Sequence, residues 1–558
     1  MRITVLGIVC LIMVILSSGI AAGEATSYLP VSHRVHDFLE RMEHLVDIPD
    51  ALLGAKPLTR ADAARLLYSI STDSDWLTDT DIDELNYLRD EFKNDYLGNN
   101  KLAWEDLGPV KHMPDFLSGF VYRNRRNLYS STGENYSLYF DPIVVREATI
   151  GKEHVTSDDD NVYMFGNGLK IRGTVGEHMG FHIDVRDSRE FGSRDYSDTT
   201  IQTMPGRGWV SSKDDHVEFD ETSAHLAYTN GPLSVMFGRG KNIWGRGYRG
   251  TLALSGYSSP YDMFRLETEF WKLKFIFFAA EIEQYPAMAN YYFNDPLSTV
   301  SDSVAVKKRM TGHRVELGLT DRINIGFYEN VVYGGRWDWS YLNPVIFLKG
   351  AEHNNGDHDN AAMGMDFRVM LHHAHSLYGE FFIDDITTSK LGTDWYGNKF
   401  AYQLGTFLVM PFGLRDVDTR IEYTRIKPWV YTNRIQYNTY TNYGDVLGYP
   451  LGPNSDEIFM QIRKRFSRKF HTALSFARRR HGANPEGVNL GGDPLSGYQD
   501  GDSHKAKFLA GDLEITKRIS FDMSYEIFWE LFMRIGYSYD DYNGDTTNIY
   551  RFSFGLNQ

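Results

Sequence analysis

The stretch from residue 238 to residue 271 joins two predicted β-strands through a loop rich in glycine and arginine. The loop begins Gly238-Arg239-Gly240-Lys241-Asn242-Ile243-Trp244-Gly245-Arg246-Gly247-Tyr248-Arg249-Gly250. Beyond it, apolar and polar side chains alternate as Phe264-Arg265-Leu266-Glu267-Thr268-Glu269-Phe270-Trp271. This period of two is typical of a strand with one apolar and one polar face. If the pattern recurs along the chain with its apolar face against lipid, the sequence predicts an outer-membrane barrel with this loop at its mouth or inside it.

The amino-acid composition is compatible with such a barrel. The mean hydropathy is -0.40 and 42% of the residues are hydrophobic, values that also suit a soluble protein. A transmembrane barrel, however, places only alternate residues against lipid and contains no long apolar run. The aromatic content of 14% favours strands and aromatic girdles. The net charge of -16 argues against nucleic acid as a partner.

The N-terminus has the pattern of a secretory signal peptide. Met1 and Arg2 precede an apolar run over residues 3–16, and small residues follow up to Ala22, where we expect cleavage. A lipoprotein anchor at Cys10 is disfavoured because few residues precede it. Cys10 is the only cysteine, so the mature chain is expected to contain neither disulfides nor cysteine-ligated metal.

Residues 23–115 are predicted to form a small helical unit on the periplasmic side. Apolar residues recur at helical spacing in three stretches, the last two of which follow Thr59 and Thr80 as expected N-caps. An alternative interpretation compares residues 57–67 with an S-layer homology segment, which would tether the protein to the cell wall. Because only one such segment occurs, packed amphipathic helices are favoured.

Residues 116–558 are predicted to form an all-β transmembrane barrel of about eighteen antiparallel strands. The strands are expected to begin near residues 136, 161, 179, 218, 233, 263, 273, 307, 323, 362, 375, 399, 415, 455, 469, 506, 531 and 548. Short turns alternate with long loops, as in barrels whose short turns face the periplasm. Residues 117–129 also look strand-like, but counting them would break the even strand number.

Several motifs carry a resemblance to a known family. The main ones are Gly238-Arg239, Trp244-Gly245-Arg246-Gly247, Leu252-Ala253-Leu254-Ser255, Pro260-Tyr261-Asp262 and Leu447-Gly448-Tyr449-Pro450-Leu451-Gly452-Pro453-Asn454-Ser455-Asp456. Weaker agreement lies in residues 57–60 and 479–482. On these residues, and over most of the mature chain, the sequence resembles the Wzi-like capsule assembly family of outer-membrane proteins. The resemblance implies an eighteen-stranded barrel with a periplasmic helical bundle, which acts as a surface lectin and holds capsular polysaccharide on the outer membrane.

Two interpretations of the loop that contains Trp244 remain open. In the first, Arg239, Arg246 and Arg249 bind acidic sugars, while Trp244 and Tyr248 offer flat faces for stacking. In the second, which we favour, residues 242–260 fold into the lumen and narrow it. The arginines would then pair with wall carboxylates, for which Glu267, Glu269 and Glu422 are candidates.

Further candidate ligands lie near predicted external strand ends. The cationic run Arg478, Arg479 and Arg480 could guide an anionic polymer, although solvated rim charge is an equally good explanation. Trp337 and Trp339 suit stacking against sugar rings, yet aromatic residues near a barrel rim more often belong to the girdle.

No motif predicts catalysis or a bound metal. His353, Asp357, His358 and Asp359, with residues 158–160, lack a recognised ligand spacing and are interpreted as acidic loops. Because no nucleophile elbow, zinc helix or phosphate loop occurs, we expect no enzyme activity and no cofactor. The alternatives to a polysaccharide-binding barrel are an aqueous porin for small solutes and, less favoured, a barrel-hosted hydrolase. Outer-membrane lipid is the other expected partner, and a monomer is favoured.

Overall fold

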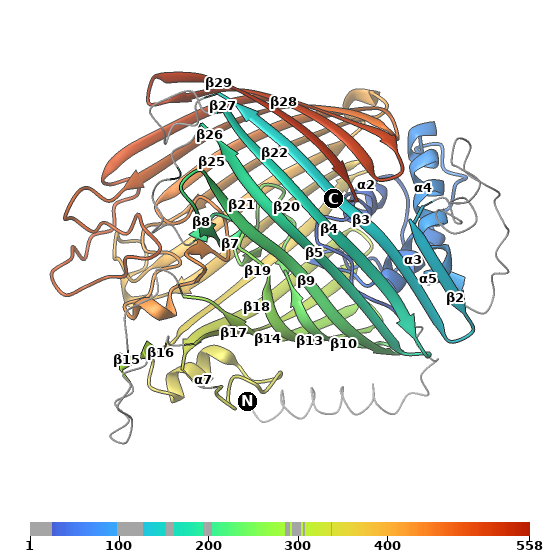
Figure 1. Ribbon diagram of the computed structural model, residues 1–558. Helices are drawn as coiled ribbons and strands as arrows, with labels where there is room; N and C mark the ends of the chain where they lie inside the picture. The colour runs from blue at the N-terminus through green and yellow to red at the C-terminus, as the bar shows by residue number, and fades with distance from the viewer. Residues whose placement is uncertain are drawn as a thin grey trace.

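The computed structural model describes residues 25–97, 126–151, 161–193, 196, 203–284, 291–292, 303–304, 307–335 and 337–557 (Figure 1). In this part of the chain, eighteen antiparallel strands follow one another in chain order and form a closed barrel. They are β3 (Tyr136–Ile150), β4 (Asn161–Val175), β5 (Met179–Gly192), β9 (His216–Asn230), β10 (Leu233–Gly240), β13 (Tyr261–Phe270), β14 (Leu273–Ile282), β17 (Lys308–Thr320), β18 (Ile323–Gly334), β19 (Asn360–His372), β20 (His375–Asp385), β21 (Lys399–Val409), β22 (Val417–Ile426), β25 (Ser455–Ser467), β26 (Phe470–Ala483), β27 (Asp512–Phe528), β28 (Leu531–Tyr542) and β29 (Asp545–Leu556). Strand β29 pairs with β3 and closes the barrel. The predicted strand number is confirmed.

Shorter strands extend the barrel or lie in its loops. β2 (Tyr129–Gly133) pairs with β3, and β8 (Ser211–Ser212) pairs with β9. The loops contain the pairs β6 (Thr203–Met204) with β7 (Gly208–Trp209), β15 (Tyr291–Tyr292) with β16 (Ser303–Val304), and β23 (Thr441–Asn442) with β24 (Asp445–Val446). Three short 3-10 helices are η1 (Thr388–Lys390), η2 (Pro411–Gly413) and η3 (Gln436–Asn438). Of the strand-like residues 117–129, Tyr129 begins β2, and residues 117–125 lie outside the described part.

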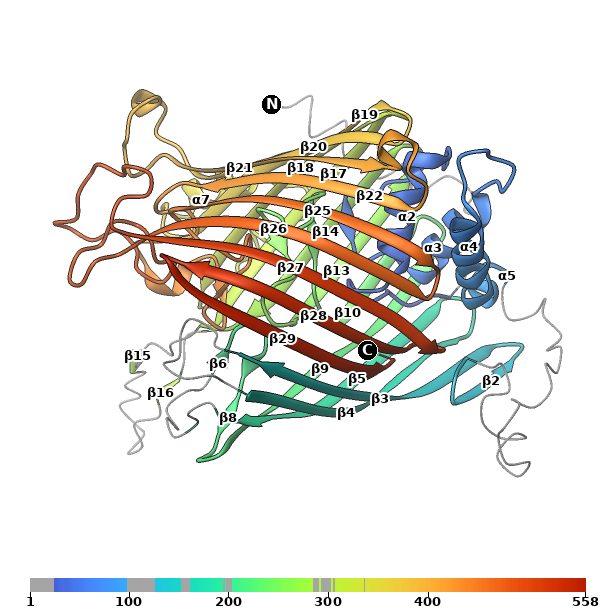
Figure 2. The same cartoon turned by 90° about the horizontal axis from the view of Figure 1, so that it is seen from above.

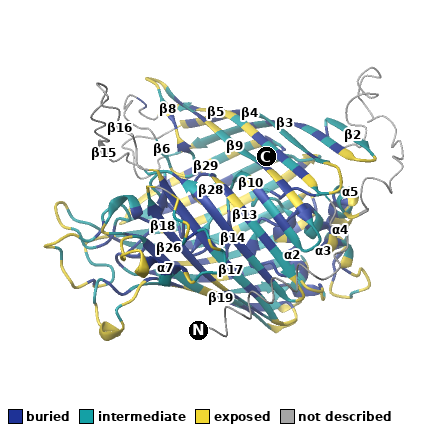
Figure 3. Cartoon of the chain, turned by 90° about the horizontal axis from the view of Figure 1, so that it is seen from below, coloured by how far each residue is buried: buried dark blue, intermediate teal, exposed yellow. Residues whose placement is uncertain are grey.

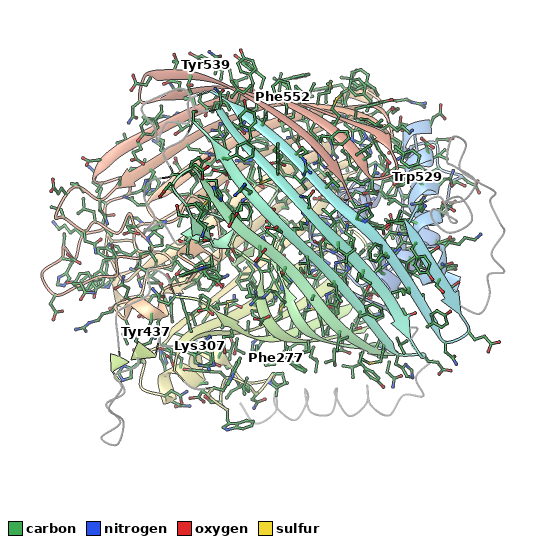
Figure 4. All side chains as sticks on the ribbon, in the orientation of Figure 1. Phe277, Lys307, Tyr437, Trp529, Tyr539 and Phe552 are labelled. Carbon is green, nitrogen blue, oxygen red and sulfur yellow. The ribbon has the colours of Figure 1, made fainter. Side chains whose placement is uncertain are left out.

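The alternation of side chains in β13 agrees with the predicted two-faced strand. Phe264 is 39% exposed on the outer surface, whereas Arg265 is fully buried and Glu267 is 4% exposed. The two buried charges pair across 2.6 Å inside the barrel. Figure 3 shows buried residues concentrated along β13, β14, β17 and β18. On β28 and β29, the outward aromatic residues Tyr539 and Phe552 lie at the surface (Figure 4).

The two ends of the barrel differ. Short turns gather at the end that carries the helical unit, and long loops with helix α7 (Leu348–Asn354) gather at the other (Figures 1 and 2). One link departs from the expected alternation: residues 543–544 join β28 to β29 by a tight turn. Strand β27 also begins later than expected, because Leu509 and Gly511 have positive φ angles of 58° and 102° that interrupt an extended chain.

The helical unit contains α2 (Val35–Leu45), α3 (Arg60–Ser69), α4 (Asp79–Glu91) and α5 (Lys93–Leu97). Thr59 caps α3 as expected, by accepting a hydrogen bond from the backbone N–H of Asp62. The expected cap at Thr80 is wrong. Thr78 caps α4 instead, because it forms a reciprocal capping box with Asp81. Among the described helices, none combines the length and apolar character required to cross a bilayer.

Candidate functional site

The N-terminal segment and the loop after β10 meet inside the barrel. They form a three-stranded sheet of β1 (Ala55–Lys56), β11 (Ile243–Trp244) and β12 (Leu254–Ser255). Ala55 lies opposite Trp244, and the backbone N–H of Gly245 donates to the carbonyl of Gly54 over 2.8 Å. The sheet therefore joins the helical unit to the loop through backbone hydrogen bonds. We call residues 241–260 the lumenal loop.

Trp244 anchors the lumenal loop in an apolar cluster. Its side chain is fully buried and meets Phe278 of β14 edge to face, with 5.3 Å between ring centroids. Leu252 and Leu254 of the same loop are also buried in this cluster. An indole in this position cannot stack against a sugar at the cell surface, because no part of it reaches solvent.

Arg246 points toward the helical unit and not toward the wall carboxylates that we expected. Its Nη1 lies 2.6 Å from Oε1 of Glu43 in α2, and Arg368 of β19 lies 3.4 Å from the other oxygen. Glu267 is instead paired with Arg265 and Lys274, at 2.6 and 3.2 Å, and Glu269 is paired with Arg65 and Lys274, at 3.0 and 3.2 Å. The expected pairing with Glu267 and Glu269 was wrong because Lys274 lies on the strand next to these carboxylates, within direct cross-strand reach.

Two wall carboxylates receive backbone N–H groups of the lumenal loop. Glu422 of β22 accepts hydrogen bonds from the N–H groups of Tyr248 and Arg249, at 2.8 and 3.2 Å. Glu380 of β20 accepts from the N–H groups of residues 252 and 253, at 2.8 and 3.1 Å. Such bonds fix the path of a loop that has little regular structure of its own. Tyr248 also stacks against Phe459 at 5.8 Å.

The expected arginine run on β26 is divided between the two faces of the strand. Arg479 points inward, and its Nε donates to Glu457 over 2.6 Å; Arg249 binds the same carboxylate over 3.0 Å. Arg480 forms a two-pronged pair with Asp456, and Arg478 lies on the same face as Arg480 because side chains alternate along a strand. The three arginines therefore do not form one cationic surface.

Arg239 lies apart from the other arginines of the motif. It pairs with Asp262, its cross-strand neighbour on β13, through two hydrogen bonds of 3.0 and 2.5 Å. Arg239 lies on the same side of β10 as Phe237, whose ring is 69% exposed on the outer surface. Its side chain is thus outside the lumen and takes no part in holding the lumenal loop.

The second motif that carries the family resemblance, residues 447–456, is hydrogen-bonded to the lumenal loop. The backbone N–H of Ser255 donates to the carbonyl of Leu447 over 2.9 Å, and its hydroxyl donates to the carbonyl of Gly448 over 2.6 Å. The side-chain amide of Asn454 donates to the carbonyls of Gly482 and Ala510. These two bonds tie residues 447–456 to the two ends of the loop between β26 and β27. The two motifs that are far apart in sequence thus form one hydrogen-bonded body between the lumen and the external loops.

Trp337 and Trp339 lie in the external loop between β18 and β19. Trp339 is 86% exposed, and Trp337 lies under the guanidinium of Arg309 at 4.9 Å. Tyr341 nearby is buried, and its hydroxyl donates to Asp359 over 2.7 Å. Trp337 and Trp339 are thus the candidate ligand residues from the sequence that expose an aromatic ring at the external end of the barrel.

Sequence reasoning missed an aromatic cluster that unites three external loops. Tyr396 stacks on Tyr498 with 3.9 Å between centroids, and Trp395 packs beside Tyr396 at 4.8 Å. His504 lies 5.8 Å from Tyr498, and buried Trp429 supports Tyr498 edge to face. We call these five residues the external aromatic cluster. Trp395, Tyr396 and Tyr498 are partly exposed, and adjacent Trp395 and Tyr396 were the only local signal of it.

Three potential metal ligands meet at the end of α7. Oxygen or nitrogen atoms of Glu352, His353 and Asp357 lie within 4.8 Å of one another. Burial raises the pKa of Glu352 to about 7, and Lys349, whose Nζ lies 3.1 Å away, acts in the opposite direction. A metal ion would have to compete with Lys349 for this carboxylate, and we assign no metal to the group. Residues 158–160 lie outside the described residues.

A family model described as capsule assembly protein Wzi matches residues 118–547. This chain belongs to the capsule assembly protein Wzi family. Its fold is similar to that of a solved structure of Wzi, an outer-membrane protein of Escherichia coli described as a carbohydrate-binding β-barrel involved in group 1 capsule assembly. The sequences are 14% identical, the TM-score is 0.57, and the match covers 94% of this chain and 99% of that one.

Other solved structures match over a smaller part of the chain. OprD of Pseudomonas aeruginosa has a TM-score of 0.41 at 10% identity, with 75% of this chain and 94% of that chain covered. OccAB2 of Acinetobacter baumannii has a TM-score of 0.44 at 11% identity, with 76% and 98% covered. No curated protein matches the sequence.

Proposed function

We propose that this protein binds a surface polysaccharide at the external face of the outer membrane and helps to hold it there during capsule assembly. Membership of the capsule assembly family and the carbohydrate-binding relative support this role. The observation that carries it to particular residues is the external aromatic cluster, where Trp395, Tyr396 and Tyr498 offer partly exposed rings. Flat aromatic faces supported by packing suit the apolar faces of sugar rings.

Charged side chains around the external aromatic cluster suit an acidic polymer. Lys390 lies 5.5 Å from the ring of Trp395. Arg434, from the loop that also carries Trp429, is exposed and only loosely paired with Asp500 at 3.7 Å. Trp337 and Trp339 are secondary candidates for the same polymer. In this proposal the lumenal loop positions the external loops and does not touch the sugar.

The proposal describes a binding protein and not an enzyme or a porin. A porin needs an open column of water, whereas the lumenal loop and helix α2 fill the lumen near Trp244 and Glu43. Contact of the outer aromatic belt with outer-membrane lipid, a monomeric state and export by a cleaved signal peptide are further parts of the proposal.

The test is polysaccharide binding by the purified protein in detergent. Surface polysaccharide extracted from the strain that produces the protein would be titrated against the wild type, Trp395→Ala and Tyr498→Ala. We expect each variant to bind about tenfold more weakly, equivalent to about 1.4 kcal/mol. Trp76→Ala is the matched control, because Trp76 is a 44% exposed tryptophan on the helical unit at the opposite end. Equal loss in all three variants, or loss in none, would contradict this assignment.

A further inference from the structure

A cavity of about 380 Å³ lies between the helical unit and the inner wall of the barrel, at the end opposite the external loops. Its walls come from the segment before α2, from helices α4 and α5, from strands β3, β4 and β5, and from the turn between β27 and β28. Trp529, labelled in Figure 4, marks its position near the helices. Clefts between two structural units are frequent binding sites, and this volume lies at the small end of the usual range.

The cavity is cationic, although the whole protein is acidic. Eight of its lining residues are Lys or Arg and four are Asp or Glu, in a chain whose net charge is -16. Several of these cations already have partners. Arg186 forms a two-pronged pair with Asp184, and Arg60 forms one with Asp95.

Two cations on β4 differ from the rest. Lys170 donates through Nζ to the backbone carbonyl of Asn557 over 2.8 Å, and Arg172 lies over the ring of Tyr139 at 4.0 Å. Within the described ranges, neither has a carboxylate at ion-pair distance. Both residues are half-buried and project from the same face of the strand. Both therefore present positive charge to the cavity that no carboxylate of the described residues neutralises by direct contact.

A buried histidine adds a polar atom without a partner. His182 of β5 lies directly opposite Arg172 in the strand register. It is 4% exposed, and among the described residues its Nε2 has no hydrogen-bond partner. The adjacent ring of His225 cannot serve, because its Nε2 accepts the backbone N–H of Tyr28 over 3.0 Å. A buried polar atom of this kind is costly unless a ligand or water satisfies it.

We propose that this cavity binds the phosphate or carboxylate group of a small polar molecule. Arg172 supplies a planar fork of donors that fits two oxygens of such a group, and Lys170 supplies a second positive charge. His182 Nε2–H donates a third hydrogen bond. The site lies at the periplasmic end, so it is separate from the external aromatic cluster and does not depend on polysaccharide binding there.

Calorimetric titration of the full-length protein in detergent tests the site. The probes are inorganic phosphate, glycerol 3-phosphate as the glycerophosphate part of a phospholipid, and glucuronic acid as an acidic sugar, with glucose as the neutral control. We expect at least one charged probe to bind and glucose not to bind. The tightest probe identifies the source of the anionic group. Binding should weaken as salt rises, since the attraction to a partly hydrated cavity is screened.

Arg172→Gln and Lys170→Gln locate the binding. We expect each to weaken the affinity for the best probe at least tenfold. Arg322→Gln removes one positive charge from an exposed turn at the same end of the barrel, outside the cavity, and should leave the affinity unchanged. If Arg172→Gln does not fold, Lys170→Gln and the salt dependence decide. Absence of binding for all three charged probes, equal binding of glucose, or unchanged affinity in the folded cavity variants would overturn the proposal.

Discussion

Arg246 and Glu43 form an ion pair of 2.6 Å in which each side chain is only 4% exposed. The pair links the lumenal loop, which descends from the external end, to helix α2, which enters from the periplasmic end. Neither segment fills the lumen alone, because the sheet of β1, β11 and β12 takes one strand from the helical unit and two from the loop. The lumen is therefore filled by two parts of the chain together, and the residues that pair across them lie 203 positions apart.

The first prediction concerns the stability of this joint. Arg246→Met leaves Glu43 buried with only the longer contact to Arg368, and we expect a loss of roughly 3 to 5 kcal/mol in the free energy of unfolding. Arg239→Met is the control, since Arg239 is exposed and its pair with Asp262 contributes about 1 kcal/mol or less. Urea unfolding in detergent measures both variants. Similar losses for the two arginines would contradict the assignment of Arg246 alone to the plug.

The barrel was readable from the sequence because its signal is local. Phe264 faces outward and Arg265 inward because successive side chains of a strand point to opposite faces. The outer face of the barrel wall meets lipid, and the inner face meets the polar lumen. The count of strands followed from such alternating runs, and the alternation of short and long links supported it independently. The errors at Leu509 and Thr80 are boundary errors, decided by a positive φ angle and by a competing capping box.

The site could not be read in the same way, because its contacts join distant segments. No local pattern indicates that Arg246 pairs with Glu43 of the helical unit. Nor does one indicate that Glu422 accepts hydrogen bonds from backbone N–H groups and not from an arginine side chain. The run of arginines at residues 478–480 was also misleading, since strand alternation sends its members to opposite faces. The external aromatic cluster draws its five residues from three loops and is visible only once the barrel brings these loops together.

The second prediction concerns topology. Because Cys10 is the only cysteine, single cysteines can report which side of the membrane a position faces. Asn355 is exposed in the long loop after α7, and Thr320 is exposed at the end of β17, beside a short turn. A membrane-impermeant maleimide should label Asn355→Cys on intact cells and label Thr320→Cys only after the outer membrane is opened. The reverse labelling pattern would show that the barrel has the opposite orientation in the membrane.

The third prediction concerns acid. Burial alone would raise the pKa of Glu40 in α2, but the charge and hydrogen bonds of Arg420 outweigh it and hold the value at about 2. Asp81 in α4 is likewise held at about 2 against burial, by Arg41 and Arg465. Both pKa values are below those of the unfolded chain, near 4.5 and 3.8. The stability that these carboxylates contribute is therefore complete above pH 4.5 and is lost as the pH falls toward 2.

Thermal unfolding between pH 6 and pH 2.5 measures this loss, with a slope of up to about 1.4 kcal/mol per pH unit for each carboxyl group. Glu40→Gln should be less stable than the wild type at pH 6 and should show a shallower slope. A wild-type midpoint that does not change between pH 4.5 and pH 2.5 would mean that these ion pairs add nothing to the attachment of the helical unit.

The last prediction concerns conductance, and it separates the plugged barrel from a porin. Trp244, Leu252 and Leu254 fill the lumen with apolar side chains, and Glu380 and Glu422 hold the loop backbone to the wall. We therefore expect the wild type to show low, unsteady conductance in planar bilayers. Replacing residues 242–260 by a short Gly/Ser turn removes this packing and should raise the conductance. Shortening the external loop at residues 387–397 is the control, because that loop lies at the external end, and it should change the conductance little. Large, stable conductance of the unmodified protein would show that water passes the lumenal loop, and the function would then be transport of small solutes.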